Sequence, residues 1–414
     1  MSKAMGAIPA EFRADEDGML LIGGRRADAL VAEAGDTPLF VYDLGMIDAR
    51  IARFRSAFPA VALHYAIKAN PYVPLLEHVA KQIDGLDVAS GGEMKLAVAA
   101  GVEPARISFA GPGKRDAELA AAIAAGATLN CESEGEAERA IAAGERLGLA
   151  PKIAVRVNPD FEIRGSGMRM GGGARPFGVD CERVPALVRR LVAAGADWRG
   201  FHIFAGSQAL GADALIEAQR ATLALAGRLA EEAGAAPASL NLGGGFGIPY
   251  VHGEQPLDVE AVGAALTGAL QCRPQVLANT SFAIELGRWL VGEAGVYLTR
   301  VIDRKVSHGK TFLVTDGGMH HQLAASGNFG QVVRRNFPVA IATRFGAPPE
   351  EEASIVGCLC TPLDRLADDV ALPRAEVGDL VAVFLAGAYG LSASPQAFLA
   401  QAPAREMTVG GSGS

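Results

Sequence analysis

The chain has 414 residues, of which 50% are hydrophobic and 20% are charged. This balance is typical of folded proteins with a large core and excludes a mainly disordered chain. The formal net charge of −8 gives no support to nucleic-acid binding, which usually requires a basic surface.

One pattern repeats between residues 61 and 288: a short apolar run, a turn, and an amphipathic stretch rich in Ala, Leu and Glu. Apolar residues at three- and four-residue spacing in the amphipathic stretches, as in EGEAERAIAAGERLG, predict helices with one buried face. The expected strands are 61–68, 85–89, 106–110, 128–131, 152–157, 200–204, 239–242 and 281–285. The expected helices are 74–83, 92–100, 115–125, 134–147, 184–194, 212–233 and 259–270.

Eight strands that alternate with helices predict an α/β fold, namely a (β/α)8 TIM-like barrel. An open doubly wound sheet is the alternative. Its dinucleotide fingerprint G-x-G-x-x-G is incomplete in both GGGFGI and GSGMRM, which favours the barrel.

After residue 288 the sequence changes to β-branched and aromatic runs separated by turn residues, such as TFLVTD, ASIVGCLC and REMTV. These runs predict a second, C-terminal all-β domain, which the early segments MLLIG and LFVYD are expected to join. The predicted limits are 37–284 for the barrel and 1–36 plus 285–409 for the β domain. Residues 410–414 (GGSGS) resemble an artificial linker and are left out of the fold prediction.

Five cysteines without a C-x-x-C pair indicate reduced thiols rather than a disulfide framework. No apolar stretch reaches the ~18 residues of a membrane span, and MSKAMGAIPAEF lacks the layout of a signal peptide. We therefore expect a cytoplasmic protein that does not associate with a membrane.

Polar residues stand at the ends of the predicted strands, where barrel enzymes carry their chemistry. They are Lys68, Asp87, Arg156, His202, Ser207, Glu285 and Arg288. Among apolar neighbours the charged form of the Lys68 amine is poorly solvated, which favours the neutral amine that a Schiff base requires. Alternatively, the aliphatic stem of Lys68 covers the rim and its head reaches water.

Three further features of the sequence indicate which ligand such a lysine would bind. The backbone N–H groups of Gly243, Gly244 and Gly245 could approach a phosphate, or the glycines could simply form a tight turn. His202 could stack on a planar ring, or lie in the core. Glu285 could keep a ring nitrogen protonated, or pair with Arg288. Taken together, an aldehyde, a planar ring, a basic nitrogen and a phosphate describe pyridoxal 5′-phosphate.

The motifs HYAIKANP, DVASGGE, RVNP, GFHIFAGSQ, NLGGGFG, ELGR, DGG, GCLCTPLD and GAYG follow in this order. In this respect the chain resembles the fold-type III decarboxylases that use pyridoxal 5′-phosphate, which include diaminopimelate and ornithine decarboxylases. The resemblance spans nearly the whole chain and implies a (β/α)8 barrel followed by a β domain. It also implies a carboxy-lyase that removes the α-carboxylate of an amino acid.

The resemblance implies a role for each matching position. Lys68 would bind the cofactor aldehyde, His202 would stack on its ring and Glu285 would bind the ring nitrogen. The implied phosphate site consists of Ser207, Gly243, Gly244, Gly245 and Arg288. Asp87 and Arg156 would lie near the lysine and the ring hydroxyl, and Tyr389 would close over the cofactor.

The same resemblance implies a head-to-tail homodimer in which the CLCTPLD segment of one subunit enters the site of the other. Cys360, the implied proton donor, and Asp364 would then be supplied in trans. The expected substrate contacts are Arg288, Arg335, Cys360, Asp364 and Tyr389.

Departures from the family pattern bear on the substrate. Diaminopimelate decarboxylases carry HIGSQ, EPGR and a glutamate in CES, whereas this chain has HIFAGSQ, ELGR and CTP. The missing glutamate, together with DGGMHHQLAASGNFGQVVRRNFPV, makes the chain resemble the exosortase-associated and butirosin-pathway subgroup. Some members of that subgroup act on an amino acid, such as glutamate, that is bound to a carrier protein. The expected substrate is therefore a conjugated or carrier-bound amino acid, and the alternative is free meso-diaminopimelate or ornithine.

Two arginine-bearing segments could contact such a substrate. Arg334 and Arg335 could bind a carboxylate or a phosphopantetheine phosphate, or be solvated surface charges. The glycine-rich segment 164–175 could be a lid or a docking strip for an acidic carrier, or a plain loop.

Other functions are less well supported by the sequence. A racemase would share the barrel, but Glu285 and CLCTPLD argue against it. A protein that binds the cofactor without catalysis is disfavoured because Lys68, Glu285 and Cys360 are all present. No metal is expected, since the adjacent His320 and His321 would point to opposite faces of a strand.

Overall fold

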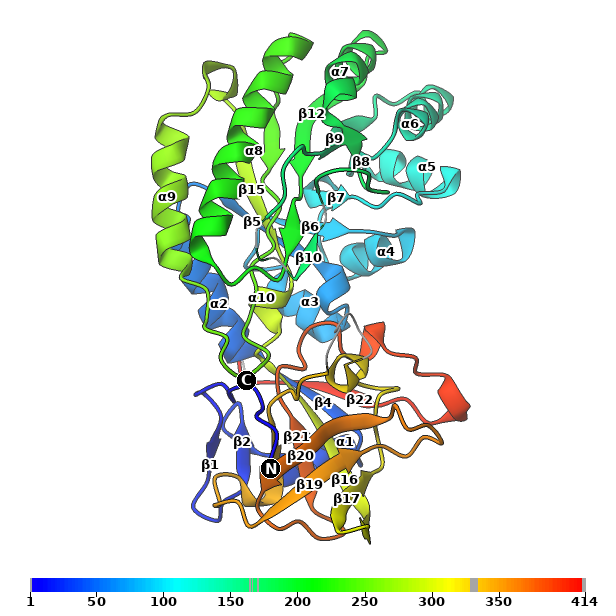
Figure 1. Cartoon of the computed structure of the whole chain (residues 1–414). Coiled ribbons are helices and arrows are strands. Elements are labelled where there is room, and N and C mark those ends of the chain that lie inside the picture. The colour runs from blue at the N-terminus through cyan, green and yellow to red at the C-terminus, as the bar shows by residue number, and fades with distance from the viewer. Residues whose placement is uncertain (1, 164, 166, 170, 328–333, 412–414) are drawn as a thin grey trace. The chain divides into compact units, whose positions relative to one another are not determined.

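The computed structural model describes residues 2–163, 165, 167–169, 171–327 and 334–411. By their contacts, the residues divide into two compact units (Figure 1). The first unit, the β unit, comprises Met1–Arg50, Pro249–Gln255 and Arg288–Ser414, and the second, the barrel unit, comprises Ile51–Ile248 and Pro256–Gly287.

In the barrel unit, the described residues form eight parallel strands that close on themselves, because β15 pairs with β5 and β8 pairs with β9. The strands are β5 (Ala62–Ala66), β6 (Gly85–Val88), β7 (Ile107–Phe109), β8 (Thr128–Cys131), β9 (Lys152–Asn158), β12 (Asp197–Ile203), β14 (Ser239–Asn241) and β15 (Ser281–Leu286). Two short strand pairs lie outside the eight-stranded barrel: β11 (Val179–Asp180) pairs with β9, and β10 (Met168–Arg169) pairs with β13 (Gly206–Ser207). The barrel prediction is confirmed, and the open doubly wound sheet is wrong.

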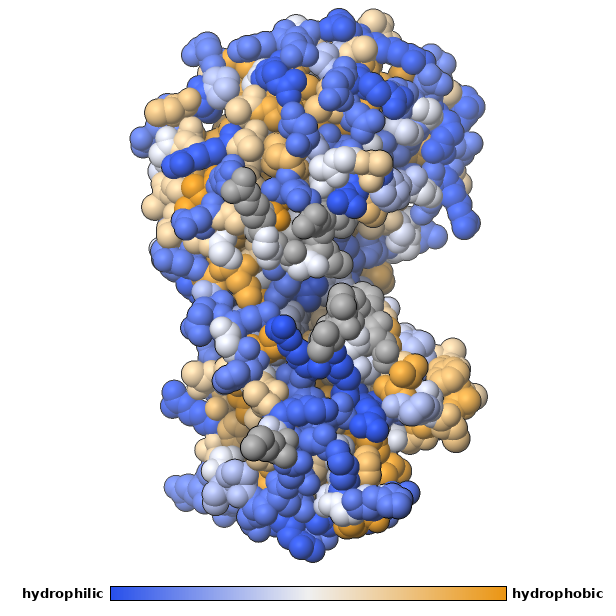
Figure 2. Space-filling view, in the orientation of Figure 1, coloured by the Kyte–Doolittle hydropathy of each residue, from blue (hydrophilic) through white to orange (hydrophobic). Residues whose placement is uncertain are grey.

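Helices cover the outside of this barrel (Figure 1). They are α3 (Val73–Val79), α4 (Gly91–Ala99), α5 (Asp116–Ala125), α6 (Glu134–Leu147), α7 (Val184–Ala193), α8 (Ala212–Ala233) and α9 (Val259–Gln271), and α2 (Leu44–Ala57) leads into the first strand. Their ends follow local sequence: the Ser90 and Ser133 hydroxyls cap α4 and α6, and Gly148 ends α6 in the left-handed region. The face shown in Figure 2 is mostly hydrophilic over these helices, as expected where only one side of each is buried.

The β unit is built on one mixed sheet whose main path runs β18–β21–β16–β17–β19–β20. Its strands are β4 (Leu39–Asp43), β16 (Gly295–Ser307), β17 (Lys310–Thr315), β18 (Val339–Ile341), β19 (Glu351–Val356), β20 (Arg365–Leu372), β21 (Leu380–Val383) and β22 (Arg405–Val409). A small sheet of β1 (Arg13–Ala14), β2 (Leu20–Ile22) and β3 (Arg25–Arg26) and the helices α1 (Ala27–Ala34) and α10 (Arg288–Val291) complete the unit. The predicted β domain is thus present, with two helices in addition to its sheets.

The segment LFVYD forms β4, which pairs antiparallel with β16 and parallel with β22. Residues 39–43 therefore belong to the β sheet, whereas the predicted barrel segment began at residue 37. The chain enters the barrel unit only at Ile51, within α2. Among the described residues, no helix is both long and apolar enough to cross a membrane.

Candidate active site

Five predicted residues lie at the carboxyl ends of barrel strands. Asp87 is in β6, Arg156 in β9, His202 in β12 and Glu285 in β15, while Lys68 follows β5 in the short 3-10 turn Ile67–Ala69. Strand register sets their alignment, because His202 is directly opposite Arg156. The closed barrel thus brings together residues that are far apart in the sequence.

His202 and Glu285 form the centre of this arrangement. His202 Nε2 lies 3.1 Å from Glu285 Oε2, and Asn241 Nδ2 donates a hydrogen bond of 3.2 Å to the same oxygen. Both side chains of the pair are buried. Burial alone would raise the pKa of the Glu285 carboxyl, but the His202 ring, together with the charges of Lys68 and Arg156, outweighs burial and holds that pKa below its ordinary value. Glu285 is therefore ionised at neutral pH.

Asp87 has a neighbour that the sequence analysis did not identify. His64, within β5, places Nδ1 3.3 Å from Asp87 Oδ2. Burial lowers the pKa of His64, but the negative charges of Asp87 and Glu285 outweigh burial and raise it above its ordinary value. The signal was available in HYAIKANP, where a histidine stands in an otherwise apolar strand four residues before the lysine.

Arg156 is held by a second residue that the sequence analysis missed. Its Nη1 donates to Glu132 Oε1 at 2.9 Å, and both side chains are almost fully buried. Glu132 also accepts hydrogen bonds from the backbone N–H groups of Gly111 and Gly178, so it joins Arg156 to two rim loops. Glu132 directly follows the predicted strand 128–131, and a carboxylate at a strand end was a signal that could have identified it.

Lys68 differs from the expectation of an amine enclosed by apolar side chains. Its side chain is exposed, and Nζ lies 5.9 Å from the centroid of the Phe204 ring. The physical reason is the 3-10 turn, which carries Lys68 beyond the end of β5 onto the open rim. Lys68 remains at the same barrel end as Asp87, Arg156, His202 and Glu285.

The glycine run after β14 has a definite structural cause. A Cβ on Gly244 would lie 1.8 Å from the carbonyl oxygen of Glu285, and one on Gly245 would lie 2.2 Å from that of Gly206. Gly243 has a φ of +69°. Close backbone approach therefore requires glycine here, as in the predicted tight turn, and it brings the run next to β13, which contains Ser207.

In the β unit, Arg288 and Tyr389, both of which the resemblance assigns to the cofactor site, lie close together. The guanidinium carbon of Arg288 is 4.7 Å from the centroid of the Tyr389 ring, and Nη1 donates to the Tyr250 hydroxyl at 2.8 Å. Tyr389 adopts a φ of +53°, which is unusual for a bulky residue and indicates a constrained position. Tyr250 was not predicted, and no sequence pattern distinguishes it.

Cys360 and Asp364 differ sharply in exposure. The Cys360 thiol is exposed. Asp364 is buried, accepts hydrogen bonds from the N–H groups of Met319 and Leu359, and its pKa is raised by burial. Asp364 therefore holds its own loop through hydrogen bonds. Its buried position differs from the exposed position that a substrate contact in a partner's site requires.

The two arginines that were expected to contact the substrate, Arg334 and Arg335, have different surroundings. Arg334 forms an ion pair with Asp368 and donates to the carbonyl oxygen of Arg365, so it is a structural residue, while Arg335 is exposed.

Of the segment 164–175, positions 164, 166 and 170 lie outside the described residues, as do 328–333 of the DGG motif region. His320 and His321 lie in a turn, not in the expected strand, with ring centroids 3.8 Å apart.

Comparison with known proteins now identifies the family. Residues 44–292 match the family described as "Pyridoxal-dependent decarboxylase, pyridoxal binding domain". The chain belongs to the pyridoxal-dependent decarboxylases. It is 37% identical, over 88% of its length and 86% of the relative, to the L-glutamyl-[BtrI acyl-carrier protein] decarboxylase of Niallia circulans. It is 32% identical, over 93% of its length and 90% of the relative, to the diaminopimelate decarboxylase of Methanothermobacter thermautotrophicus.

Solved structures of pyridoxal-dependent decarboxylases show the same fold. The diaminopimelate decarboxylase of M. jannaschii in complex with L-lysine superposes with a TM-score of 0.88 at 26% identity, over 97% of this chain and 93% of that chain. The enzyme from Helicobacter pylori complexed with L-lysine gives a TM-score of 0.81 at 26% identity, over 92% of this chain and 94% of that chain. This protein is therefore a decarboxylase, a carboxy-lyase that uses pyridoxal 5′-phosphate.

The barrel residues fit this cofactor. Within the part of the chain that the structure describes, His202 Nδ1 and Asp87 Oδ1 are buried with neither a hydrogen-bond partner nor an ion-pair partner. Buried polar atoms of this kind normally have partners, so their positions suit a polar ligand. An ionised Glu285 suits a protonated ring nitrogen, and the exposed amine of Lys68 suits an aldehyde.

Proposed function

We propose that this enzyme removes the α-carboxylate of an amino acid carried on an acyl carrier protein, with L-glutamate as the first candidate. The observation that carries the proposal is the 37% identity, over 88% of the chain, to a decarboxylase named for such a substrate. The segment after Cys360 supports it. Thr361 has no charge with which to recognise a distal amine, and its hydroxyl accepts a hydrogen bond from the N–H group of Leu363.

The barrel residues have distinct roles in this proposal. Bound pyridoxal 5′-phosphate supplies the electron sink for the electron pair left when the bond between Cα and the carboxylate breaks and CO2 departs. Lys68 holds the cofactor through its amine. Glu285 keeps a proton on the ring nitrogen, since an ionised carboxylate favours the cationic form of its neighbour. His202 would contact the ring, and the ion pair between Arg156 and Glu132 would hold the guanidinium for the ring hydroxyl.

Ser207 and the N–H groups of Gly243–Gly245, all within the barrel unit, bind the phosphate in this proposal. Within the β unit, Tyr389 keeps Arg288 in place. We propose a homodimer in which Cys360 of one copy donates the proton that replaces the carboxylate at Cα in the other. The exposed position of the Cys360 thiol supports this role. Asp364 has no role in it, because its carboxylate is buried in its own loop.

Substrate choice tests the proposal directly. Holoenzyme is given L-glutamate linked to the BtrI acyl-carrier protein, free L-glutamate, free meso-diaminopimelate and free ornithine, and products are read by mass spectrometry. We expect kcat/KM for the carrier-linked substrate to exceed that for every free amino acid by at least about tenfold, since remote binding energy adds to transition-state stabilisation. Equal or faster turnover of free diaminopimelate contradicts the proposal and favours the free-amino-acid alternative, which the 32% identity to diaminopimelate decarboxylases supports.

A further inference from the structure

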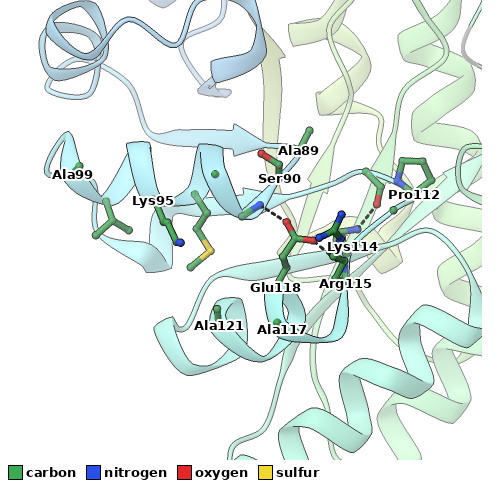
Figure 3. A pocket seen from close by; sticks show the side chains of 16 residues that line it. Ala89, Ser90, Lys95, Ala99, Pro112, Lys114, Arg115, Ala117, Glu118 and Ala121 are labelled. Atoms are coloured by element: carbon green, nitrogen blue, oxygen red, sulfur yellow. Dashed lines mark hydrogen bonds between the residues drawn. The ribbon is translucent and has the colours of Figure 1, made fainter.

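A hollow outside the predicted site lies between α4 and α5 on the outside of the barrel (Figure 3). We call it the α4–α5 groove; its volume is about 1030 Å³. Its floor is apolar and comes from both helices: Met94, Val98, Ala99, Ala117 and Ala121. Val98 is 45% exposed, although its side chain is large and apolar. An exposed apolar surface between polar edges is typical of a protein-binding site.

Small side chains keep the groove open. Alanines occupy three of the five floor positions, and α4 and α5 contact each other much less than α5 and α6 do. The rim end of the groove is nevertheless fixed, because Glu118 accepts hydrogen bonds from the N–H groups of Gly91 and Arg115 at 2.6 Å and 2.9 Å. The hydrogen bonds of Glu118 therefore join the start of α4 to the start of α5 and fix the spacing of the two helices at this end of the groove (Figure 3).

The exposed charges on the groove are positive. Lys95 of α4 and Arg115 at the start of α5 are both exposed, and Arg115 is one of the groups whose charge lowers the pKa of Glu118, the carboxyl that also lines the groove. Lys114, the third cation, is buried and neutralised by Glu136 at 2.6 Å. Two exposed cations beside an apolar floor match a partner that offers both acidic and apolar side chains. These basic residues stand out in a chain whose net charge is −8.

The groove opens at the same barrel end as the candidate active site. Ala89 and Ser90, at one edge, directly follow β6, which carries Asp87. Gly111 and Pro112, at the other edge, follow β7, the next strand of the barrel. If a protein that carries the substrate on a flexible tether bound here, the tether would reach the rim where the polar residues of the candidate active site lie.

We propose that the α4–α5 groove docks an acidic, amphipathic helix of the carrier protein that brings the substrate. This inference rests on the proposed function and deepens it. The apolar face of the helix covers the floor residues, and its carboxylates pair with Lys95 and Arg115, as in other helix-in-groove complexes. Complementary charges mainly raise the rate of association, so the contact is weakened by salt.

The test compares charge reversal at the groove with charge reversal elsewhere on the barrel. The groove variant is Lys95→Glu with Arg115→Glu, and the control is Arg220→Glu, which changes an exposed cation on α8. Steady-state kinetics with glutamyl-BtrI carrier and with free amino acid are combined with fluorescence anisotropy, using labelled carrier that lacks its prosthetic arm. We expect the groove variant to lose about tenfold or more in kcat/KM and in affinity for the carrier only, whereas the control is unchanged.

Each other outcome has a defined meaning. If wild-type enzyme does not prefer the carrier-linked substrate, the proposed function fails. If it does and the groove variant keeps full carrier affinity, only the docking proposal is overturned. If the groove variant loses activity on both substrates equally and sediments as a smaller species than wild type, the groove is an interface between copies of this chain, which also overturns carrier docking. A further variant, Ala121→Trp, fills the floor without changing charge and should weaken carrier binding in the same assay.

Discussion

The substitution Glu132→Gln tests whether the buried ion pair with Arg156 organises the rim of the barrel. It keeps the size of the side chain but removes its charge. Glu132 Oε1 lies 2.9 Å from Arg156 Nη1, and the two side chains are only 2% and 9% exposed. The substitution leaves an uncompensated guanidinium in a buried position, which costs about 3–5 kcal/mol. A glutamine amide also turns a donor toward groups that all donate, namely Arg156 and two backbone N–H groups.

The matched control is Glu138→Gln in α6, which removes the same charge from an Arg–Glu pair on the surface. Glu138 and its partner Arg190 are 52% and 55% exposed, so we expect a loss of no more than about 1 kcal/mol. The chain has two tryptophans, Trp198 in the barrel unit and Trp289 in the β unit. Both variants are therefore made in a Trp289→Phe background, where fluorescence during urea unfolding reports on the barrel.

We expect the urea midpoint of Glu132→Gln to fall well below that of Glu138→Gln, and its kcat/KM to fall as well, because Arg156 is no longer held at the rim. The m-value should stay the same if only stability has changed. Equal midpoints for the two variants would refute the reasoning, since they would mean that burial of the pair has no energetic consequence.

Three further predictions follow from the geometry. Gly244→Ala should abolish cofactor binding or destabilise the barrel, because its Cβ would lie 1.8 Å from a carbonyl oxygen of β15; a cofactor absorption spectrum like that of wild type, with unchanged stability, would contradict this. The raised pKa of His64 means that its contribution to stability is complete below the ordinary histidine pKa and is lost as the pH rises through the raised value. The midpoint difference between wild type and His64→Asn should therefore shrink from pH 6 to pH 9, and a difference that grows would oppose it. Mixing inactive Lys68→Ala and Cys360→Ala chains should restore activity if two copies share each site; verified mixed dimers without activity would argue against sharing.

Much of the fold could be predicted because its strands and helices follow local patterns. Helices α6 and α8 have the expected ranges 134–147 and 212–233, since periodicity marks their length, Gly148 and Gly234 end them, and Ser133 and Gly211 precede their first residues. Strand β20, RLADDVAL, was missed because two adjacent aspartates interrupt its alternation. Their charges are matched by partners from distant segments, such as Arg334 for Asp368 and Lys310 for Asp369, which local sequence does not reveal.

The candidate site also contains residues that local sequence predicts and residues that depend on tertiary contacts. Lys68, Asp87, His202 and Glu285 could be predicted because a polar residue at a strand end is a local signal with a topological meaning. The inward position of Asp364 and the contact of Arg288 with Tyr250 depend on tertiary contacts within the β unit. His64 lies inside the predicted strand 61–68 and Glu132 directly after the predicted strand 128–131, so both lie within reach of the same rule. Polar residues inside or directly after apolar strands therefore merit the same attention as those at the predicted ends.

The most direct test of the central claim is to locate the covalent bond between chain and cofactor. Holoenzyme is reduced with borohydride, digested, and analysed by peptide mass spectrometry, with Lys95 as an internal reference for an exposed lysine of the same barrel end. We predict that the pyridoxyl group is found on Lys68, and that Lys68→Ala neither carries it nor releases CO2 from any substrate. Labelling spread over surface lysines, or full decarboxylation by Lys68→Ala, would contradict the account.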